Sequence, residues 1–294
     1  MHRTITSNWR PLLPASHAFL IAIAALWAIP RNAHAQVYVV QGQEAGYVSE
    51  YNSTTGAVIN ANFITGLNGP IGLALSGNNL FVTNGDGSTV GKYDATTGGA
   101  INAGFITGLD TPIAIAVSGN NLFVTYFTTQ GTYTVGEYDA TTGAAINTNF
   151  ITGLKYIFEL TVLRNRLFVS SYETSRNGGN VYKIGKYDAT TGAAINPSFI
   201  IGPNLLFAAR GNALFLGDPG SDLVGKYDAV TGSAINRRFI TGVRGVDGIA
   251  LLDNSVFVLS GVKFTVGKYD ATTGAPIKAR LVTGLAVPTG ITVK

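Results

Sequence analysis

The chain has 294 residues, with 20 Lys and Arg against 16 Asp and Glu, and it contains no Cys, 3 His, 2 Trp and 1 Met. All the His, Trp and Met residues lie within the first 35 positions. Residues 36–294 therefore lack the atoms needed for disulfides, thiolate nucleophiles, Cys/His zinc sites, haem ligation and any Ser-His-Asp triad.

The surplus of positive charge belongs largely to the same first segment, which holds Arg3, Arg10 and Arg31. Without them, the net charge is close to zero, which excludes the basic footprint of a nucleic-acid-binding or anionic-membrane-binding protein. Charged residues make up only 12% of the chain, and all 37 Gly follow residue 35. This composition predicts many short strands joined by tight turns.

Residues 1–35 are organised like a secretory signal peptide. Arg3 and Arg10 precede an apolar run over 18–29, and Ala33-His34-Ala35 follows. A basic start, an apolar run and an Ala-x-Ala end predict cleavage before Gln36. The run is shorter than the about 20 residues that span a membrane, so we expect no retained membrane span. The sequence thus predicts an exported protein, periplasmic or extracellular, whose folded part is 36–294.

That folded part consists of one repeat that occurs six times. The motif Tyr-Asp-Ala-Thr-Thr-Gly begins at Tyr93, Tyr138, Tyr187 and Tyr269, and altered copies begin at Tyr51 and Tyr227. Successive copies are 40 to 49 residues apart, and no segment has the apolar period of a helix. This period is typical of four-stranded propeller blades.

One copy illustrates the predicted blade. Its β-branched and aromatic runs, separated by Gly and Asn, predict strands over 113–117, 121–125 and 134–138 and a fourth strand within 144–151. The first strand alternates bulky and small residues. We expect its bulky face to pack against the small face of the next blade, where the blades crowd around the axis.

The two ends of the repeat region complement each other. The first copy lacks a first strand, and the final segment, with Ile291 and Val293, lacks a second one. We expect these residues to pair with 37–40. The sequence therefore predicts an all-β fold, a six-bladed β-propeller of four-stranded antiparallel blades closed by pairing of the N- and C-terminal strands.

The repeat resembles a known superfamily. The segments G-I-A-x-x-G-N-x-L-F-V and V-G-K-Y-D-x-x-T-G are similar to those of NHL and TolB-like six-bladed propellers, which include gluconolactonase-like proteins, and the style of repeat is similar to that of secreted bacterial proteins. The resemblance covers nearly all of 36–294. It implies the fold, and in gluconolactonase-like relatives a divalent ion sits in the channel, held by oxygen ligands from several blades.

The repeated charged residues suggest structural roles. Each Asp of the motif, such as Asp94, opens a turn, and we expect its carboxylate to accept hydrogen bonds from the Thr and Gly N–H groups that follow, with Gly in the left-handed conformation. The Lys that precedes the motif, such as Lys92, is expected to lie in solvent at the outer part of each blade.

Function is expected where the repeat is broken, in the loops that enter the first strand and those that join the second to the third. These two sets of loops should meet at one end of the channel. The ligand-binding candidates there are Asp86, Asp110, Lys155, Tyr172, Arg176, Asp218 and Arg244.

Glu159 is the most informative acidic residue, because it occupies a position that holds Gly or Ala in four other blades. A carboxylate on the innermost strand must reach the channel, find a partner or have a raised pKa. Pairing with Lys155 is the simpler interpretation, and a ligand or metal role is the other. The resemblance implies four counterparts of calcium ligands, Glu159, Asn204, Asp247 and Asp110. It also makes Glu159 and Asp247 the catalytic candidates.

We therefore expect a secreted, non-enzymatic propeller, a monomer without a resident cofactor. Loops at one channel end would bind a protein, a glycan or another surface ligand. The alternative is a calcium-dependent hydrolase or lactonase of the gluconolactonase-like type, and a purely structural role in an envelope or matrix is a third interpretation. None of these involves nucleic acid.

Overall fold

The computed structural model describes residues 35–42, 45–175, 177–202, 206–217, 220 and 222–294. The chain divides into two units, Met1–Ala33 and His34–Lys294. The first unit, and with it almost all of the predicted signal peptide, lies outside the described residues. No helix among the described residues is long and apolar enough to cross a membrane.

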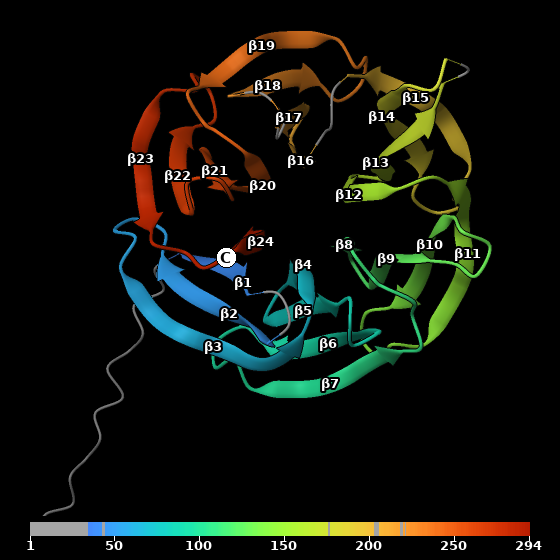
Figure 1. Cartoon of the computed structure of the whole chain (residues 1–294), viewed down its shortest axis with the longest axis horizontal. Coiled ribbons are helices and arrows are strands. Elements are labelled where there is room, and N and C mark those ends of the chain that lie inside the picture. The colour runs from blue at the N-terminus through green and yellow to red at the C-terminus, as the bar shows by residue number, and fades with distance from the viewer. Residues whose placement is uncertain (1–34, 43–44, 176, 203–205, 218–219, 221) are drawn as a thin grey trace, which may run out of the picture. The chain divides into compact units, whose positions relative to one another are not determined.

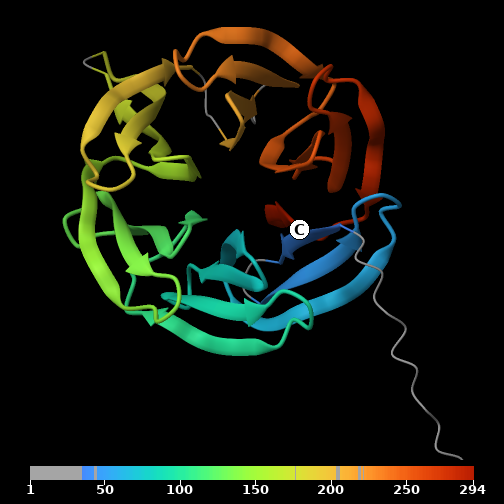
Figure 2. The same ribbon diagram turned by 180° about the vertical axis from the view of Figure 1, so that it is seen from behind.

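Six four-stranded antiparallel sheets surround a central axis (Figures 1 and 2), which confirms the predicted six-bladed propeller. From the axis outward, blade 1 comprises β24 (Pro288–Val293), β1 (Gln36–Gln41), β2 (Ala45–Asn52) and β3 (Val58–Asn68). Blade 2 comprises β4 (Pro70–Ser76), β5 (Asn79–Asn84), β6 (Thr89–Asp94) and β7 (Ala100–Thr107). Blade 3 comprises β8 (Ile115–Ser118), β9 (Asn121–Phe127), β10 (Tyr133–Asp139) and β11 (Ala145–Leu154).

The remaining three blades follow the same order. Blade 4 comprises β12 (Ile157–Leu163), β13 (Arg166–Thr174), β14 (Asn180–Asp188) and β15 (Ala194–Ile201). Blade 5 comprises β16 (Leu206–Arg210), β17 (Ala213–Gly217), β18 (Leu223–Asp228) and β19 (Ala234–Thr241). Blade 6 comprises β20 (Val246–Leu252), β21 (Ser255–Ser260), β22 (Thr265–Asp270) and β23 (Pro276–Thr283).

The ring closes through blade 1, as predicted. β24 pairs antiparallel with β1, and its Ile291 and Val293 lie opposite Val39 and Val37. In Figure 1 the red C-terminal strand accordingly lies beside the blue β1. The innermost strand of every blade thus has a hydrogen-bonded neighbour.

Small residues let the innermost strands approach one another. A Cβ added to Gly72 would lie 3.3 Å from Cγ2 of Ile115 in the next blade, and one added to Gly248 would lie 2.8 Å from Cγ2 of Ile291. Bulky residues therefore meet small ones between neighbouring blades, as the alternation predicts. Most of the core forms the layers between blades, for example Phe81, which is fully buried.

One inner strand begins later than predicted. The expected strand over 113–117 is β8, which begins at Ile115. Before it, Thr111 has a left-handed φ of +45°, and the N–H of Ala114 donates to the Thr125 hydroxyl instead of to a carbonyl of the next strand. The backbone still pairs with the next strand here, through the Ile113 N–H to the Thr125 carbonyl at 3.0 Å and the Thr125 N–H to the Ala114 carbonyl at 2.9 Å, so the segment is an irregular start of the strand.

The repeated turn has an Asp at its start and is slightly different from the prediction. One carboxylate oxygen of Asp94 accepts the N–H groups of both Thr96 and Thr97 at 2.8 Å. The N–H of Gly98 donates instead to the backbone carbonyl of Asp94. Gly98 has a φ of +74°, which is the predicted left-handed conformation. Desolvation alone would raise the pKa of Asp94, but the hydrogen bonds that its carboxylate accepts from the two threonines lower this pKa overall.

The prediction that the repeated Lys lies in solvent is wrong. Lys92 is only 7% exposed. Its ammonium donates to the carbonyl of Ala140, in the turn of the next blade, at 2.9 Å, and lies 4.8 Å from the ring centroid of Phe105. The stem of Lys is long enough to lie on apolar surface while its charged end reaches a carbonyl.

The same bond recurs at other blade boundaries. Lys186 donates to Ala229, Lys226 to Ala271 and Lys268 to Ser53, at distances of 2.8 to 3.1 Å. The last of these bonds joins blade 6 to blade 1, across the closure of the ring. We call this contact between the Lys of one blade and the turn of the next the blade joint.

The glycine of the turn completes the blade joint. The α-carbon of Gly98 lies against the carbonyl oxygen of Phe63 in blade 1, where an added Cβ would overlap this oxygen. Gly108 has nearly the same φ, +75°, but an added Cβ there would meet no atom within 4 Å. The two glycines therefore separate the effect of contact from that of backbone conformation.

We predict that Gly108→Ala lowers the free energy of unfolding by about 1 kcal/mol, through conformational strain alone. Gly98→Ala should lower it by about 1–3 kcal/mol more, because the methyl group forces the blades apart. Urea unfolding of the two variants checks this. Equal losses would show that the turn glycine is required only for its φ.

Candidate functional site

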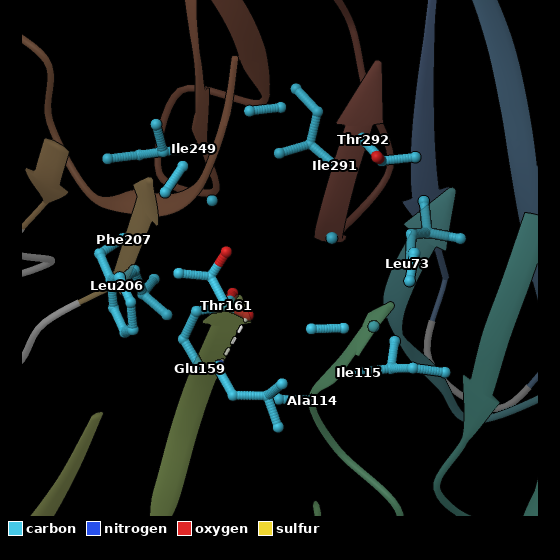
Figure 3. A pocket seen from close by; sticks show the side chains of 18 of the residues that line it. Leu73, Ala114, Ile115, Glu159, Thr161, Leu206, Phe207, Ile249, Ile291 and Thr292 are labelled. Carbon is cyan, nitrogen blue, oxygen red and sulfur yellow. Dashed lines mark hydrogen bonds between the residues drawn. The ribbon is translucent and has the colours of Figure 1, made fainter. Parts of the chain in front are cut away.

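The six inner strands surround a channel cavity of about 270 Å³. Many of the residues around it are aliphatic, among them Leu73, Ile115, Ile249 and Ile291 from four different blades (Figure 3). Glu159, on β12, brings a carboxylate to this wall. The channel thus holds an acidic group among aliphatic residues and backbone.

Glu159 occupies the place in the blade that the repeat predicts. Its N–H donates to the hydroxyl of Ser170 at 3.0 Å. The N–H groups of Gly72 and Ala114 donate in the same way to a threonine hydroxyl on the second strand of their own blades, at 2.8 and 2.9 Å. The three positions are therefore structurally equivalent, and only blade 4 has a carboxylate among them.

Glu159 is half-buried as a residue, but protein atoms surround its carboxylate in the channel. Desolvation raises its pKa to about 8, and the hydrogen bond that it accepts from the Leu160 N–H at 3.1 Å offsets only part of this effect. No ion pair between the described residues joins Glu159 to Lys155. The predicted pairing is therefore not formed, and Glu159 instead reaches the channel and has a raised pKa, while its ligand or metal role stays a prediction.

Asp247 also lines the channel cavity, on β20. Desolvation raises its pKa, although its carboxylate accepts a hydrogen bond from the Gly261 N–H. Asn204, the third predicted metal ligand, lies outside the described residues. Among the described residues, no group of three or more His, Cys, Asp or Glu is placed to hold a metal ion. Calcium binding, and with it the hydrolase or lactonase activity of Glu159 and Asp247, stays a prediction.

The predicted loop residues are spread over several blades. Asp86 is exposed in the loop of blade 2, and Arg244 is exposed and 3.5 Å from Asp222 in an ion pair. Arg176 and Asp218 lie outside the described residues. The other three candidates are found at blades 3 and 4.

Asp110, Lys155 and Tyr172 belong to one region. The Asp110 carbonyl accepts the Phe127 N–H at 2.8 Å, and the Lys155 carbonyl accepts the Tyr172 N–H at 3.3 Å. The loops that enter the first strand and those that join the second to the third meet at this end of each antiparallel blade, as predicted. We call this the loop end and the opposite end, which carries the Asp turns, the turn end.

Six aromatic rings form a continuous cluster at the loop end of blades 3 and 4. The members of this aromatic cluster are Phe127, Tyr133, Tyr156, Phe158, Tyr172 and Tyr182. The rings of Tyr156 and Tyr172 are stacked, with centroids 4.6 Å apart and planes within 11°. Desolvation, followed by the hydrogen bond with Tyr156, raises the pKa of the Tyr172 hydroxyl.

The cluster is built from equivalent positions of two blades. Phe127 and Tyr133 lie opposite each other on β9 and β10, and Tyr172 and Tyr182 lie opposite each other on β13 and β14. Tyr156 precedes β12 and contacts both pairs, 5.8 Å from Tyr133 and 4.6 Å from Tyr172 between ring centroids. One exposed ring thus joins two cross-strand pairs.

Of these six aromatic residues, only Tyr172 was among the candidates. A signal was present in the repeat, because the registers place Tyr133 and Tyr182 at the position of Ser88 in blade 2. Large rings that replace a small residue in two consecutive blades mark a departure from the repeat. The connection through Tyr156, which comes from a different loop, depends on the arrangement of the blades.

Comparison with known proteins supports the fold. No protein-family model matches the sequence, and no curated protein matches it. Among solved structures, a chain from the crystal structure of a nidogen/laminin complex matches with a TM-score of 0.68 and 15% identity, over 88% of this chain and 98% of that one. The likeness is one of fold. The NHL and TolB-like resemblance of the repeat stays a prediction.

We predict that Glu159 makes stability depend on pH. Its pKa is about 8 in the folded protein and near the ordinary 4.5 in the unfolded chain, so the folded state binds more protons between these values. The free energy of unfolding should therefore fall as the pH rises from 5 to 9, by up to about 1.4 kcal/mol per pH unit.

Urea unfolding at pH 5, 7 and 9 measures this effect. Glu159→Gln keeps the shape but does not titrate, so it should flatten the profile. The exposed Glu173 serves as the matched position, and Glu173→Gln should leave the slope unchanged. If Glu159→Gln has the wild-type slope, the carboxylate is not desolvated as described.

Proposed function

We propose that this chain is an exported binding scaffold, a closed propeller that engages a macromolecular partner through its loop end. The observation that carries the proposal is the contrast between the two ends. At the turn end, all blades have the same turn. In blade 1, Asn52 takes the place that Asp94 has in blade 2, and its side chain accepts the same two backbone hydrogen bonds. The loop end differs from blade to blade and presents the aromatic cluster.

Export is supported by the position of the predicted cleavage site. β1 begins at Gln36, and the backbone of Gln36 exchanges two hydrogen bonds of 2.9 Å with Lys294. Cleavage before Gln36 would leave this strand and the ring closure complete. The similar solved chain comes from a complex between nidogen and laminin, and we propose for this chain, too, a scaffold role with a macromolecular partner of its own.

The balance of chemical groups favours binding over catalysis. The described residues include no Cys or His, which removes thiolate nucleophiles and imidazole bases. Exposed aromatic side chains that are not needed to fill the core are typical of recognition surfaces. The loop end is therefore the surface that we assign to the partner.

The test is binding of the labelled, purified protein to washed cells of the source organism. We expect saturable binding that falls at least about 10-fold when Tyr133→Ser and Tyr182→Ser are combined, because these changes remove two of the clustered rings. The control is Val230→Glu, an exposed position of the turn end, which should bind like the wild type. If Val230→Glu loses binding and the double tyrosine variant keeps it, the partner binds at the turn end, which contradicts the proposal.

A further inference from the structure

The aromatic cluster is more than the fold requires. Blade 2 has Gly85 and Ser88 at the positions of the cross-strand pairs, and it forms the same four strands. Phe264 occupies the position of Ser88 in blade 6, with almost the same φ, +54° against +55°. No ring contact joins Phe264 to another aromatic side chain of the described residues. The blade therefore does not need aromatic residues at these positions in order to form its four strands.

Tyr156 occupies a position that suits glycine. Its φ is +44°, like those of Thr111 (+45°) and Val287 (+44°) at the same position of blades 3 and 1, whereas blades 2 and 6 have Gly69 and Gly245 there, with φ of +59° and +58°. A bulky side chain in this conformation is strained by roughly 1 kcal/mol or more. Yet the Tyr156 side chain is 52% exposed. Its ring stacks on Tyr172 and also contacts Tyr133, and about half of the side chain stays in solvent.

The charges around the cluster balance. Asp110 is near enough to Tyr133 to contribute to the raised pKa of its hydroxyl, after the effects of desolvation and Tyr156. Glu173 and Lys183 form an ion pair of 3.0 Å beside the second cross-strand pair. With Lys155, the described surroundings hold two acidic and two basic residues. This surface has no excess charge with which to select a phosphate or another polyion.

Stacking decides how a ligand can lie on the rings. Grooves that bind proline-rich peptides have aromatic rings set apart, so that a proline inserts between them. Here Tyr156 and Tyr172 are already in contact, so a ligand cannot insert between them and would lie against the exposed part of the Tyr156 ring. The electron-rich face of an aromatic ring attracts groups with a partial positive charge, such as the C–H bonds on one face of a pyranose ring.

Polar groups at the edge of the cluster suit hydroxyl-rich ligands. Tyrosine hydroxyls both donate and accept hydrogen bonds, and the carboxylates of Asp110 and Glu173 accept them. We propose that the aromatic cluster binds a neutral oligosaccharide, with one sugar ring stacked on Tyr156. This inference rests on the proposed function and specifies the chemistry of its partner.

The test combines a glycan array with isothermal titration calorimetry. The array carries neutral, sulfated and sialylated glycans, and a neutral glycan that binds is then titrated in solution. We expect binding to neutral glycans, weakened at least about 10-fold by Tyr156→Gly. This variant introduces the residue that blades 2 and 6 already have, so the backbone is relieved of strain and the fold is kept. Tyr156→Phe, which keeps the ring, should retain most of the affinity.

Phe264→Ser is the matched control, because it replaces an exposed ring at the same end with the residue of blade 2. It should bind like the wild type. The proposal is overturned if no neutral glycan binds, if Tyr156→Gly binds as tightly as the wild type, or if only charged glycans bind. If cells still bind through the loop end while neutral glycans fail to compete, the binding function stands and the carbohydrate assignment falls.

Discussion

The blade joint is the contact on which the rest of this structure depends. A propeller blade has two faces to cover, and each is covered only by a neighbour. Here a turn glycine such as Gly98 lies against the outer strand of the preceding blade, while a Lys such as Lys92 reaches forward to the next turn. The bond from Lys268 to Ser53 repeats this contact across the ring closure. The repeated motif is therefore conspicuous in the sequence because it holds neighbouring blades together.

The joint confines variation to the loop end, because the turns at the other end are committed to contacts between blades. The boundary between blades 3 and 4 departs from this scheme at both ends. Glu137 replaces the Lys, is buried, and accepts a hydrogen bond from Asn121 of its own blade at 2.7 Å. At the loop end of the same boundary, Tyr133 and Tyr156 bring rings from the two blades together. The aromatic cluster thus lies at a boundary that lacks the Lys of the blade joint, although its turn glycine, Gly192, still lies against the Phe150 carbonyl.

Features that depend on local pattern and chain order could be predicted from the sequence. The number of blades, the pairing of Ile291 with Val39 and the place of Glu159 in its blade all come from counting within a repeat. The burial of Lys92 could not be predicted in this way, because its partner carbonyl lies 48 residues away on another blade. Lysine is usually exposed, and only the positions of Phe81 and Phe105 show why this one is covered.

The same reasoning explains why the candidate site was only partly predicted. Acidic and basic residues in the loops were natural candidates, but charge alone does not show which loops meet. Tyr172 was found because it begins the longest insertion, whereas Tyr133 and Tyr182 resemble ordinary strand residues. Their common register, and the ring of Tyr156 between the pairs, become evident once the two blades are placed side by side.

Native-state hydrogen exchange tests most directly whether the blade joints make one cooperative ring. The slowest backbone amides of every blade, including those of Val39 and Ile291 at the closure, should exchange with one common free energy, equal to that of global unfolding. Separate, lower opening energies for β24 or for individual blades would contradict this account, because blades that open alone are not held by their neighbours.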